Sequence, residues 1–271
     1  TLTEDTFTGC PNLRFLNLWY NFIPSIPENI FANNPRLIYV DFDMNRLTTI
    51  GENTFTSLID LEILVLRNNP FQDIPAGTFS TLRNLTNLYL DNCRITELKP
   101  AWFENLVTLN YLELFYNQIT VIPQDIFRNN INVRTLDIAM NPFEYLAFDT
   151  FNSFINLRSL YMDNCFLTDF HPEWFDALTN LEILILYNNL FSNLSENAFA
   201  NLGSLRYLRL DNNPLGDMPA GIFRALENVH TIYLSNVGIT ELKTEWFQNM
   251  PNLIEVYLGY NAIEELPNGI F

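Results

Sequence analysis

Residues 85–108 read LTNLYLDNCRITELKPAWFENLVT, and residues 157–180 read LRSLYMDNCFLTDFHPEWFDALTN. The two stretches share their spaced leucines, an Asn-Cys pair and a Pro-x-Trp-Phe group at the same places. Units of the same kind begin at residues 13, 37, 61, 85, 109, 133, 157, 181, 205, 229 and 253. Every step is 24 residues, without insertion or deletion, so the chain is a regular array of one repeated unit.

The unit fits the pattern L-x-x-L-x-L-x-x-N/C-x-L, which is typical of leucine-rich repeats. It predicts an α/β solenoid: a right-handed superhelix of 24-residue repeats with a parallel β-sheet on the concave face and loops and short 3₁₀ turns on the convex face. We expect a single solenoid over residues 1–271. It has a partial repeat at 1–12, ten full repeats at 13–252 and a partial eleventh at 253–271. No polar capping repeat is recognisable, so we expect self-association through uncapped ends.

Three positions of the unit have structural explanations. Positions 3 to 5 are predicted to form one short strand per repeat. Position 9 is mostly Asn, which can pair the main-chain groups of a buried turn. Position 19 is Phe throughout, which predicts a spine of stacked rings. A spacing of 72 residues relates Cys93, Cys165 and Val237, and also the pairs 69–70, 141–142 and 213–214, all Asn-Pro. This longer spacing indicates a duplication of three repeats.

The composition bears on partners and location. The net charge is −17 and the pI about 4.3, which disfavours nucleic acid and anionic membranes and favours protein or peptide partners that are basic or neutral. No apolar run approaches the length of a membrane span, so we expect no direct membrane insertion.

Catalytic and metal chemistry find no support in the sequence. The two histidines, His171 and His230, lie three repeats apart, and no cysteine pair has metal-ligand spacing. We therefore predict no enzyme activity, no catalytic or metal site and no cofactor. Cys93 and Cys165 are too far apart along the stack to bridge, and Cys10 is expected to be a core thiol. Three unpaired cysteines favour a reducing compartment, whereas the sequons at Asn84 and Asn193 predict glycosylation.

The concave face is the informative surface. Of twelve tyrosines, eleven fall at positions 3, 5, 7 or 8, which point out of the sheet or its exit. Tyrosine offers rigid contact area and a hydroxyl group, although it also stabilises strands. Positions 5 and 7 place one acid in each of four successive repeats. The predicted ligand-binding residues are Tyr89, Asp91, Tyr111, Glu113, Phe115, Asp137, Tyr161, Asp163 and Tyr187. The alternative is that Arg134 and Arg158 fold over this strip and neutralise it.

Five segments share an apolar residue followed by proline and end in phenylalanine. They are IPENIF (26–31), IPAGTF (74–79), IPQDIF (122–127), MPAGIF (218–223) and LPNGIF (266–271). They are similar to the "typical" class of extracellular leucine-rich repeats, found in Toll-like receptor ectodomains, insect leucine-rich immune proteins and the variable lymphocyte receptors of jawless fish. The resemblance implies a secreted protein or receptor ectodomain that recognises ligands through its concave face.

Three hypotheses about function follow. The first is a non-catalytic recognition module of innate-immune type for a protein or peptide. The second is a structural spacer or adhesion ectodomain. The third is a cytoplasmic inhibitor that wraps a basic enzyme, which the acidic charge and the unpaired cysteines favour.

Overall fold

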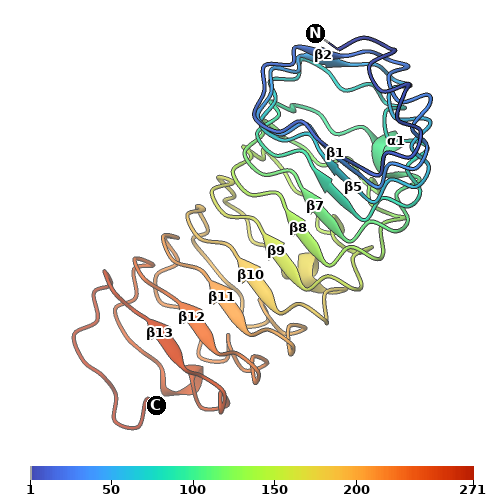
Figure 1. The fold of residues 1–271 in the computed structure, drawn as a ribbon. Helices are drawn as coiled ribbons and strands as arrows, with labels where there is room; N and C mark the ends of the chain where they lie inside the picture. Colours follow the sequence, from blue (N-terminus) through green and yellow to red (C-terminus); the bar gives the residue numbers. More distant parts are fainter. Residues whose placement is uncertain (1) are drawn as a thin grey trace. The chain divides into compact units, whose positions relative to one another are not determined.

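The fold is taken from a computed structural model that describes residues 2–271; Thr1, the first residue of the partial repeat, lies outside the described residues. The chain divides into two compact units, Thr1–Asp137 and Ile138–Phe271, which we call unit 1 and unit 2. Both units are leucine-rich-repeat solenoids, as the 24-residue pattern predicts (Figure 1).

Each repeat contributes one three-residue strand at positions 3 to 5, which confirms the predicted placement. In unit 1 these strands are β1 (Phe15–Asn17), β3 (Tyr39–Asp41), β5 (Ile63–Val65), β6 (Asn87–Tyr89), β7 (Tyr111–Glu113) and β8 (Thr135–Asp137). In unit 2 they are β9 (Ser159–Tyr161), β10 (Ile183–Ile185), β11 (Tyr207–Arg209), β12 (Thr231–Tyr233) and β13 (Glu255–Tyr257).

Within each unit, neighbouring strands are parallel and pair with a constant offset of one repeat. Tyr89 lies opposite Glu113 in unit 1, and Arg209 lies opposite Tyr233 in unit 2. A constant offset keeps each repeat position in a straight row across the sheet. Residues at the same position therefore become neighbours, although 24 residues separate them in the sequence.

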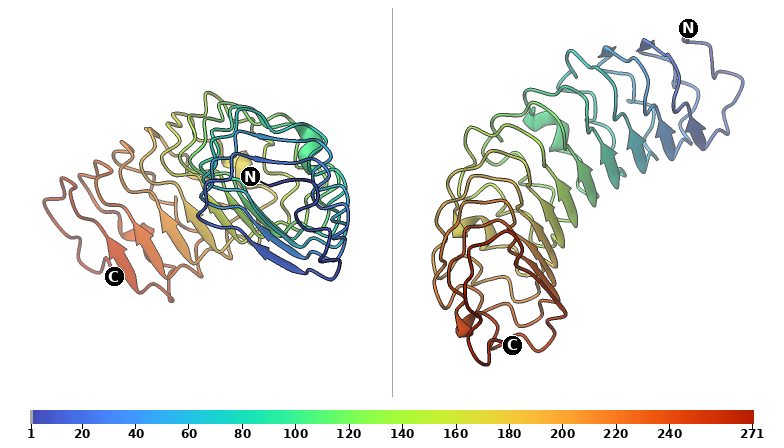
Figure 2. Two further views of the ribbon diagram at one scale, coloured as in Figure 1. Left: turned by 45° about the horizontal axis from the view of Figure 1, so that its top comes forward. Right: turned by 90° about the vertical axis from the view of Figure 1, so that its left-hand side faces the viewer.

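The side of each repeat opposite the sheet consists mainly of turns, as Figure 2 shows within each unit. Three single-turn helices occur there: the α-helix α1 (Pro100–Phe103) and the 3₁₀ helices η1 (Pro172–Phe175) and η2 (Thr244–Trp246). Sequence analysis predicted only loops and 3₁₀ turns there. It missed the α-helical geometry of α1 and a two-stranded sheet formed by β2 (Ser25–Ile26) and β4 (Thr49–Ile50).

The core lies between the sheet and these turns. Most position 4 side chains, such as Leu88 and Leu112, are fully buried. The predicted phenylalanine spine is present, with the rings of Phe31 and Phe55 stacked 6.2 Å apart between centroids. Tryptophan fills the same space in every third repeat, and Trp102 Nε1 donates a hydrogen bond to the carbonyl of Pro75 at 3.0 Å.

The position 9 asparagines pair main-chain groups between repeats. Asn117 Nδ2 donates to the carbonyl oxygens of Leu90 and Leu114, at 2.9 and 2.8 Å. Its Oδ1 accepts the main-chain N–H groups of Cys93 and Ile95, both at 3.0 Å. One buried amide thus satisfies four polar groups that water does not reach, which confirms the structural interpretation of this position.

The chain leaves each strand through a residue in the left-handed region, at position 8. All eleven of these residues have φ between 50° and 58°. Six are Asn, which tolerates this region, but the others are Tyr20, Met44, Tyr116, Met140 and Tyr260. Larger side chains are disfavoured at positive φ, so the fold by itself would select Asn at these five places.

Candidate functional site

The face of the sheet that points away from the core in unit 1 carries the side chains of positions 3, 5 and 7. Its charged and aromatic members from β3 to β8, which we call the unit 1 face, are Tyr39, Asp41, Asp43, Arg67, Tyr89, Asp91, Tyr111, Glu113, Phe115 and Asp137. The structure brings together on this face six of the nine predicted ligand-binding residues, because the constant register aligns them across β6, β7 and β8.

A hollow of about 240 Å³ opens at one end of the unit 1 face, where Arg67 is a central lining residue. Arg67 Nε lies 2.9 Å from Asp43 Oδ2, and the guanidinium carbon lies 5.7 Å from the centre of the Tyr89 ring. Asn68 Nδ2 donates to the other Asp43 oxygen at 2.8 Å. Both oxygens of this buried carboxylate are therefore paired with donors.

The next acid on the face, Asp41, is also paired. The hydroxyl of Tyr39 donates to Asp41 Oδ2 at 2.9 Å, and Asp41 Oδ1 accepts the main-chain N–H of Asp43 at 2.8 Å. Burial, and then the hydrogen bond to Asp41, raise the pKa of Tyr39 to about 12. This tyrosine is thus a fixed neutral donor, and the local network needs no ligand to complete it.

Asp91 and Glu113 form a different arrangement, because two carboxyl groups face each other in neighbouring repeats. Asp91 is buried, with 3% of its surface exposed. Its Oδ1 and Glu113 Oε2 are buried without a hydrogen-bond partner. Burial, followed by the charge of Glu113, raises the pKa of Asp91 to about 7. The pair is thus a place where negative charge is poorly compensated.

Aromatic side chains surround this carboxyl pair. The rings of Tyr89 and Tyr111 lie 5.2 Å apart between centroids, and the Tyr111 hydroxyl donates to Glu113 Oε1 at 3.0 Å. Phe115 is half-buried beyond them, and Asp137 lies opposite Glu113 in the register of β7 and β8. The centre of the unit 1 face therefore combines rigid rings with closely spaced carboxyl groups.

The other three predicted residues, Tyr161, Asp163 and Tyr187, belong to unit 2. Asp163 is buried, and this burial raises its pKa even though Asn164 and Tyr187 hydrogen-bond to it. The Tyr187 ring lies 4.3 Å from the guanidinium carbon of Arg209. In unit 2 the acid is thus embedded in a network that already contains a cation.

Sequence analysis missed the contribution of Arg209 to this network. Its guanidinium lies between the Tyr187 and Tyr233 rings and binds both oxygens of Asp211, at 3.0 and 2.8 Å. The sequence did indicate the Arg209–Asp211 contact, since these residues stand at positions 5 and 7 of one repeat and therefore on the same face of the sheet. The structure also places Arg158 NH1 3.0 Å from Glu182 on the flank, so this arginine neutralises a flank acid.

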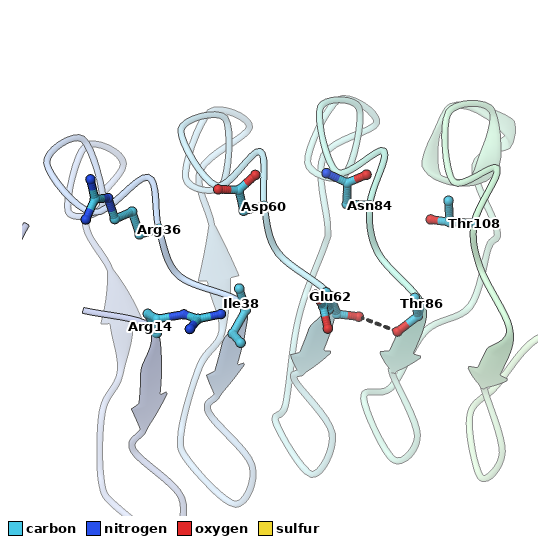
Figure 3. A pocket seen from close by; sticks show the side chains of 8 residues that line it. All are labelled: Arg14, Arg36, Ile38, Asp60, Glu62, Asn84, Thr86 and Thr108. Carbon is cyan, nitrogen blue, oxygen red and sulfur yellow. Dashed lines mark hydrogen bonds between the residues drawn. The ribbon is translucent and has the colours of Figure 1, made fainter. Parts of the chain in front are cut away.

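A second hollow, of about 600 Å³, lies on the flank of unit 1. Its lining side chains form two rows, one at position 24 and one at position 2, as Figure 3 shows. The sequon residues Asn84 and Thr86 are among them. Asn84 Nδ2 donates to the carbonyl of Ile59 at 3.0 Å, and Thr86 Oγ1 donates to the carbonyl of Glu62 at 3.0 Å. Asn193, in unit 2, is exposed, with its Nδ2 3.4 Å from Ser192 Oγ.

The cysteines and histidines require two corrections. All three thiols are free, but Cys10 is exposed and does not lie in the core as predicted, because position 22 of the partial repeat is not covered. Cys93 and Cys165 are buried, and burial raises the pKa of the Cys93 thiol. His171 stands at the repeat position of Lys99 and Lys243, which predicts a solvated side chain, but it is half-buried with its ring 5.2 Å from that of Trp174.

Two further observations concern metal binding and membrane insertion. Over residues 2–271, no group of three or more His, Cys, Asp or Glu side chains is placed to hold a metal ion. In the same part of the chain, no helix has the length and apolar character needed to cross a bilayer.

Comparison with solved structures gives several likenesses. TLR13, in its complex with ssRNA13, is 26% identical with a TM-score of 0.85, and the match covers 100% of this chain and 43% of TLR13. Toll, in the Toll–Spatzle complex of Drosophila, is 23% identical with a TM-score of 0.87, covering 99% of this chain and 38% of Toll. A Leptospira interrogans leucine-rich-repeat protein is 24% identical with a TM-score of 0.80, covering 97% of this chain and 70% of that protein.

These comparisons bear on the length of the chain and on the ligands that its fold allows. The chain spans less than half of the length of TLR13 and of Toll. Because the TLR13 structure is a complex with RNA, the exclusion of nucleic acid partners that we drew from net charge is not supported by the fold. No curated protein matches the chain.

The family model described as "Leucine rich repeat" matches residues 11–71, 35–95, 83–143, 155–215 and 227–271. Proteins of this family are in general recognition modules, and no catalytic family matches. Taken with the strands at positions 3 to 5 and the asparagine pairing at position 9, the match shows that this chain belongs to the leucine-rich-repeat family, with Toll-like receptor structures among its structural neighbours.

Proposed function

We propose that this chain is a non-catalytic recognition module that binds a protein or peptide ligand with basic groups through the unit 1 face. The observation that carries the proposal is the charge of that face. It holds five acids, Asp41, Asp43, Asp91, Glu113 and Asp137, against the single cation Arg67. Asp41 and Asp43 already have donors within the fold. Asp91, Glu113 and Asp137 stand in three successive repeats, where like charges repel one another, so a basic ligand would relieve the repulsion.

The aromatic side chains support the same proposal. Tyr89, Tyr111 and Phe115 are half-buried, so each has a supported ring and a surface left for contact. Rings beside carboxyl groups suit lysine and arginine side chains, which pair with the charge and lie against the π face. In unit 2, Tyr161, Asp163 and Tyr187 offer similar groups, but Arg209 already occupies part of that network. We therefore assign the main contact to unit 1.

We further propose an extracellular setting of innate-immune type, as a secreted protein or part of a receptor ectodomain. The support is the likeness to TLR13 and Toll, the second of which was solved with Spatzle. An RNA ligand is the competing possibility raised by the TLR13 complex. The five acids of the unit 1 face oppose a phosphate backbone, so a protein or peptide is the better supported ligand.

The test is a binding panel, measured by biolayer interferometry at two salt concentrations. The probes are synthetic peptides of equal length with zero, two or four lysines, and a single-stranded RNA oligonucleotide. We expect affinity to rise with lysine content. Asp137→Lys should slow association and weaken its salt dependence, and Tyr89→Ala should cost about 2 kcal/mol of binding free energy.

The matched control is Asp60→Lys, which makes the same charge change on the flank and should have a smaller effect. RNA binding without peptide binding would contradict the proposal. Equal effects of Asp137→Lys and Asp60→Lys would place the site away from the unit 1 face.

A further inference from the structure

The carboxyl pair Asp91–Glu113 stands out in the charge pattern of the unit 1 face. The face's Asp41 and Asp43 have donors for their oxygens, whereas Asp91 Oδ1 and Glu113 Oε2 are buried without a hydrogen-bond partner. A buried oxygen without a donor destabilises the fold, and it does so more strongly if it is charged. The fold does not explain why two such oxygens lie side by side.

The main chain holds the pair in place. Asp91 follows β6 and Glu113 ends β7, and the main-chain N–H of Leu90 donates to the carbonyl of Glu113 at 2.9 Å. The two carboxyl groups lie close enough for the charge of Glu113 to raise the pKa of Asp91. Two charged carboxylates cannot pair with each other, so a proton shared between them is the simplest way for the free protein to satisfy these oxygens.

The charged and titratable groups around the pair do not replace that proton. Arg67, after β5, places NH1 3.8 Å from Glu113 Oε2, and its Nε is bound to Asp43. Tyr111 on β7 donates to Glu113 Oε1, which is the other oxygen. Tyr89 on β6 contributes its ring, and Asp137 on β8 adds a further negative charge. The surroundings thus favour a positive group between Asp91 and Glu113.

We infer that the Asp91–Glu113 pair is a subsite for one lysine ammonium group of the ligand, which displaces the shared proton to water when it binds. The inference rests on the proposed function, because it names the group that the unit 1 face receives. An ammonium group is compact and has three donors, so it can bridge Asp91 Oδ1 and Glu113 Oε2 beside the Tyr89 and Tyr111 rings. A guanidinium is broader and flat, and Arg67 already supplies one nearby.

Proton displacement makes binding dependent on pH. The burial and the neighbouring charge that raise the pKa of Asp91 keep the shared proton in place below neutral pH. A cation must therefore compete with the proton at pH 6 but not at pH 8. For one linked proton with a pKa near 7, the affinity for an ammonium group should rise about tenfold between these pH values.

The experiment uses n-butylammonium and n-butylguanidinium as probes of the lysine and arginine side chains. Carboxyl carbon resonances of the ¹³C-labelled protein are followed by NMR during titration with each probe. We expect n-butylammonium to shift the resonances of Asp91 and Glu113, with an affinity about ten times higher at pH 8 than at pH 6. We expect n-butylguanidinium to bind more weakly.

Asp91→Asn and Glu113→Gln should each abolish the response, whereas Asp60→Asn, an exposed carboxyl group on the flank, should leave it unchanged. The lysine subsite would be overturned by the absence of shifts, by a response that survives Asp91→Asn, by an affinity independent of pH, or by tighter binding of n-butylguanidinium. The peptide panel decides the wider proposal separately: if Tyr89→Ala still weakens lysine-peptide binding, the unit 1 face remains the site even where this subsite fails.

Discussion

The main-chain N–H of Phe71 donates a hydrogen bond to the carbonyl of Asn69, 2.9 Å away, across the turn that contains Pro70. In the following repeat, the equivalent N–H of Ile95 instead donates to Asn117 Oδ1. The difference arises because Cys93 replaces the asparagine that would accept from Phe71. Phe143 and Leu215 form the same local bond, each ahead of a repeat with Cys165 or Val237 at this position.

A double-mutant cycle at Pro70 and Cys93 should therefore show coupling. Cys93→Asn alone introduces a buried Oδ1 that cannot accept from the Phe71 N–H, because this N–H already donates to the carbonyl of Asn69. We expect this substitution to destabilise the fold by about 1 kcal/mol. Adding Pro70→Leu recreates the natural arrangement in which Phe191, after Leu190, donates to Asn213 Oδ1 at 3.3 Å. We expect a favourable coupling of about 1 kcal/mol in urea unfolding, and strict additivity would contradict this explanation.

The Asp91–Glu113 pair should give stability a distinctive pH dependence. An acid whose pKa is raised by folding stabilises the protein below its unfolded pKa, near 4, and this contribution is lost as pH rises through the folded value, about 7. Asp91→Asn supplies a permanent donor to Glu113. The variant should therefore gain about 1–2 kcal/mol relative to the wild type between pH 5 and pH 8, since solvent at the sheet face screens part of the charge.

The comparison is made by urea unfolding of both proteins at pH 5, 6, 7 and 8. Asp60→Asn is the control, and its stability difference from the wild type should not change with pH in this way. A constant difference between Asp91→Asn and the wild type would show that the pair holds no shared proton.

Tyr116→Asn is expected to stabilise the fold. Tyr116 has φ 54° and is 58% exposed, so it is held in a disfavoured conformation and buries little surface in return. Asparagine suits this region, and it would extend the row in which Asn92 Nδ2 donates to Asn68 Oδ1 at 2.8 Å. We expect a gain of about 1 kcal/mol in thermal or urea unfolding.

Asn92→Tyr, the reverse exchange in the preceding repeat, should lower stability by a similar amount. If Tyr116→Asn destabilises the protein, the tyrosine has a folding role that its exposure conceals. A gain in stability combined with weaker binding of lysine peptides would add Tyr116 to the recognition surface.

The two sequons should respond differently to substitution. In unglycosylated protein, Asn84→Gln should cost about 1 kcal/mol, because it removes the hydrogen bond to Ile59, whereas Asn193→Gln should be neutral within about 0.5 kcal/mol. After expression through a eukaryotic secretory pathway, we expect peptide mapping to find a glycan at Asn193. An unmodified Asn193 would contradict the extracellular proposal.

The fold was predictable from the sequence to the level of single strands, because the 24-residue period fixes which residues become neighbours. The same period placed Tyr89, Asp91, Tyr111 and Glu113 on one face. What it did not reveal was the pairing of individual side chains. Arg67 and Arg209 mark the ends of the acidic strip in the sequence, whereas in the structure each binds an aspartate and lies against tyrosine rings.

The 72-residue spacing is a second case in which the sequence does not reveal individual contacts. In the sequence it indicates only a duplication of three repeats. The structure shows how Asn69-Pro70 and Cys93 are related. Because Cys93 replaces an asparagine, the main-chain N–H of Phe71 donates to the carbonyl of Asn69 instead. A pattern of identities does not contain this information, because the bond that forms depends on which acceptor the following repeat offers to this N–H.

Position 8 of each repeat, where the backbone is left-handed, can carry different side chains without a change in the path of the main chain. The φ values of Asn92, Tyr116 and Met140 differ by no more than 4°, so the main chain takes the same path under amide, aromatic and thioether side chains. A library that varies this position alone would alter the rim of the sheet while the hydrogen-bonded turns beneath it stay fixed. New specificities on this scaffold would then be limited by the conformational cost of each side chain at positive φ, a cost that can be measured one repeat at a time.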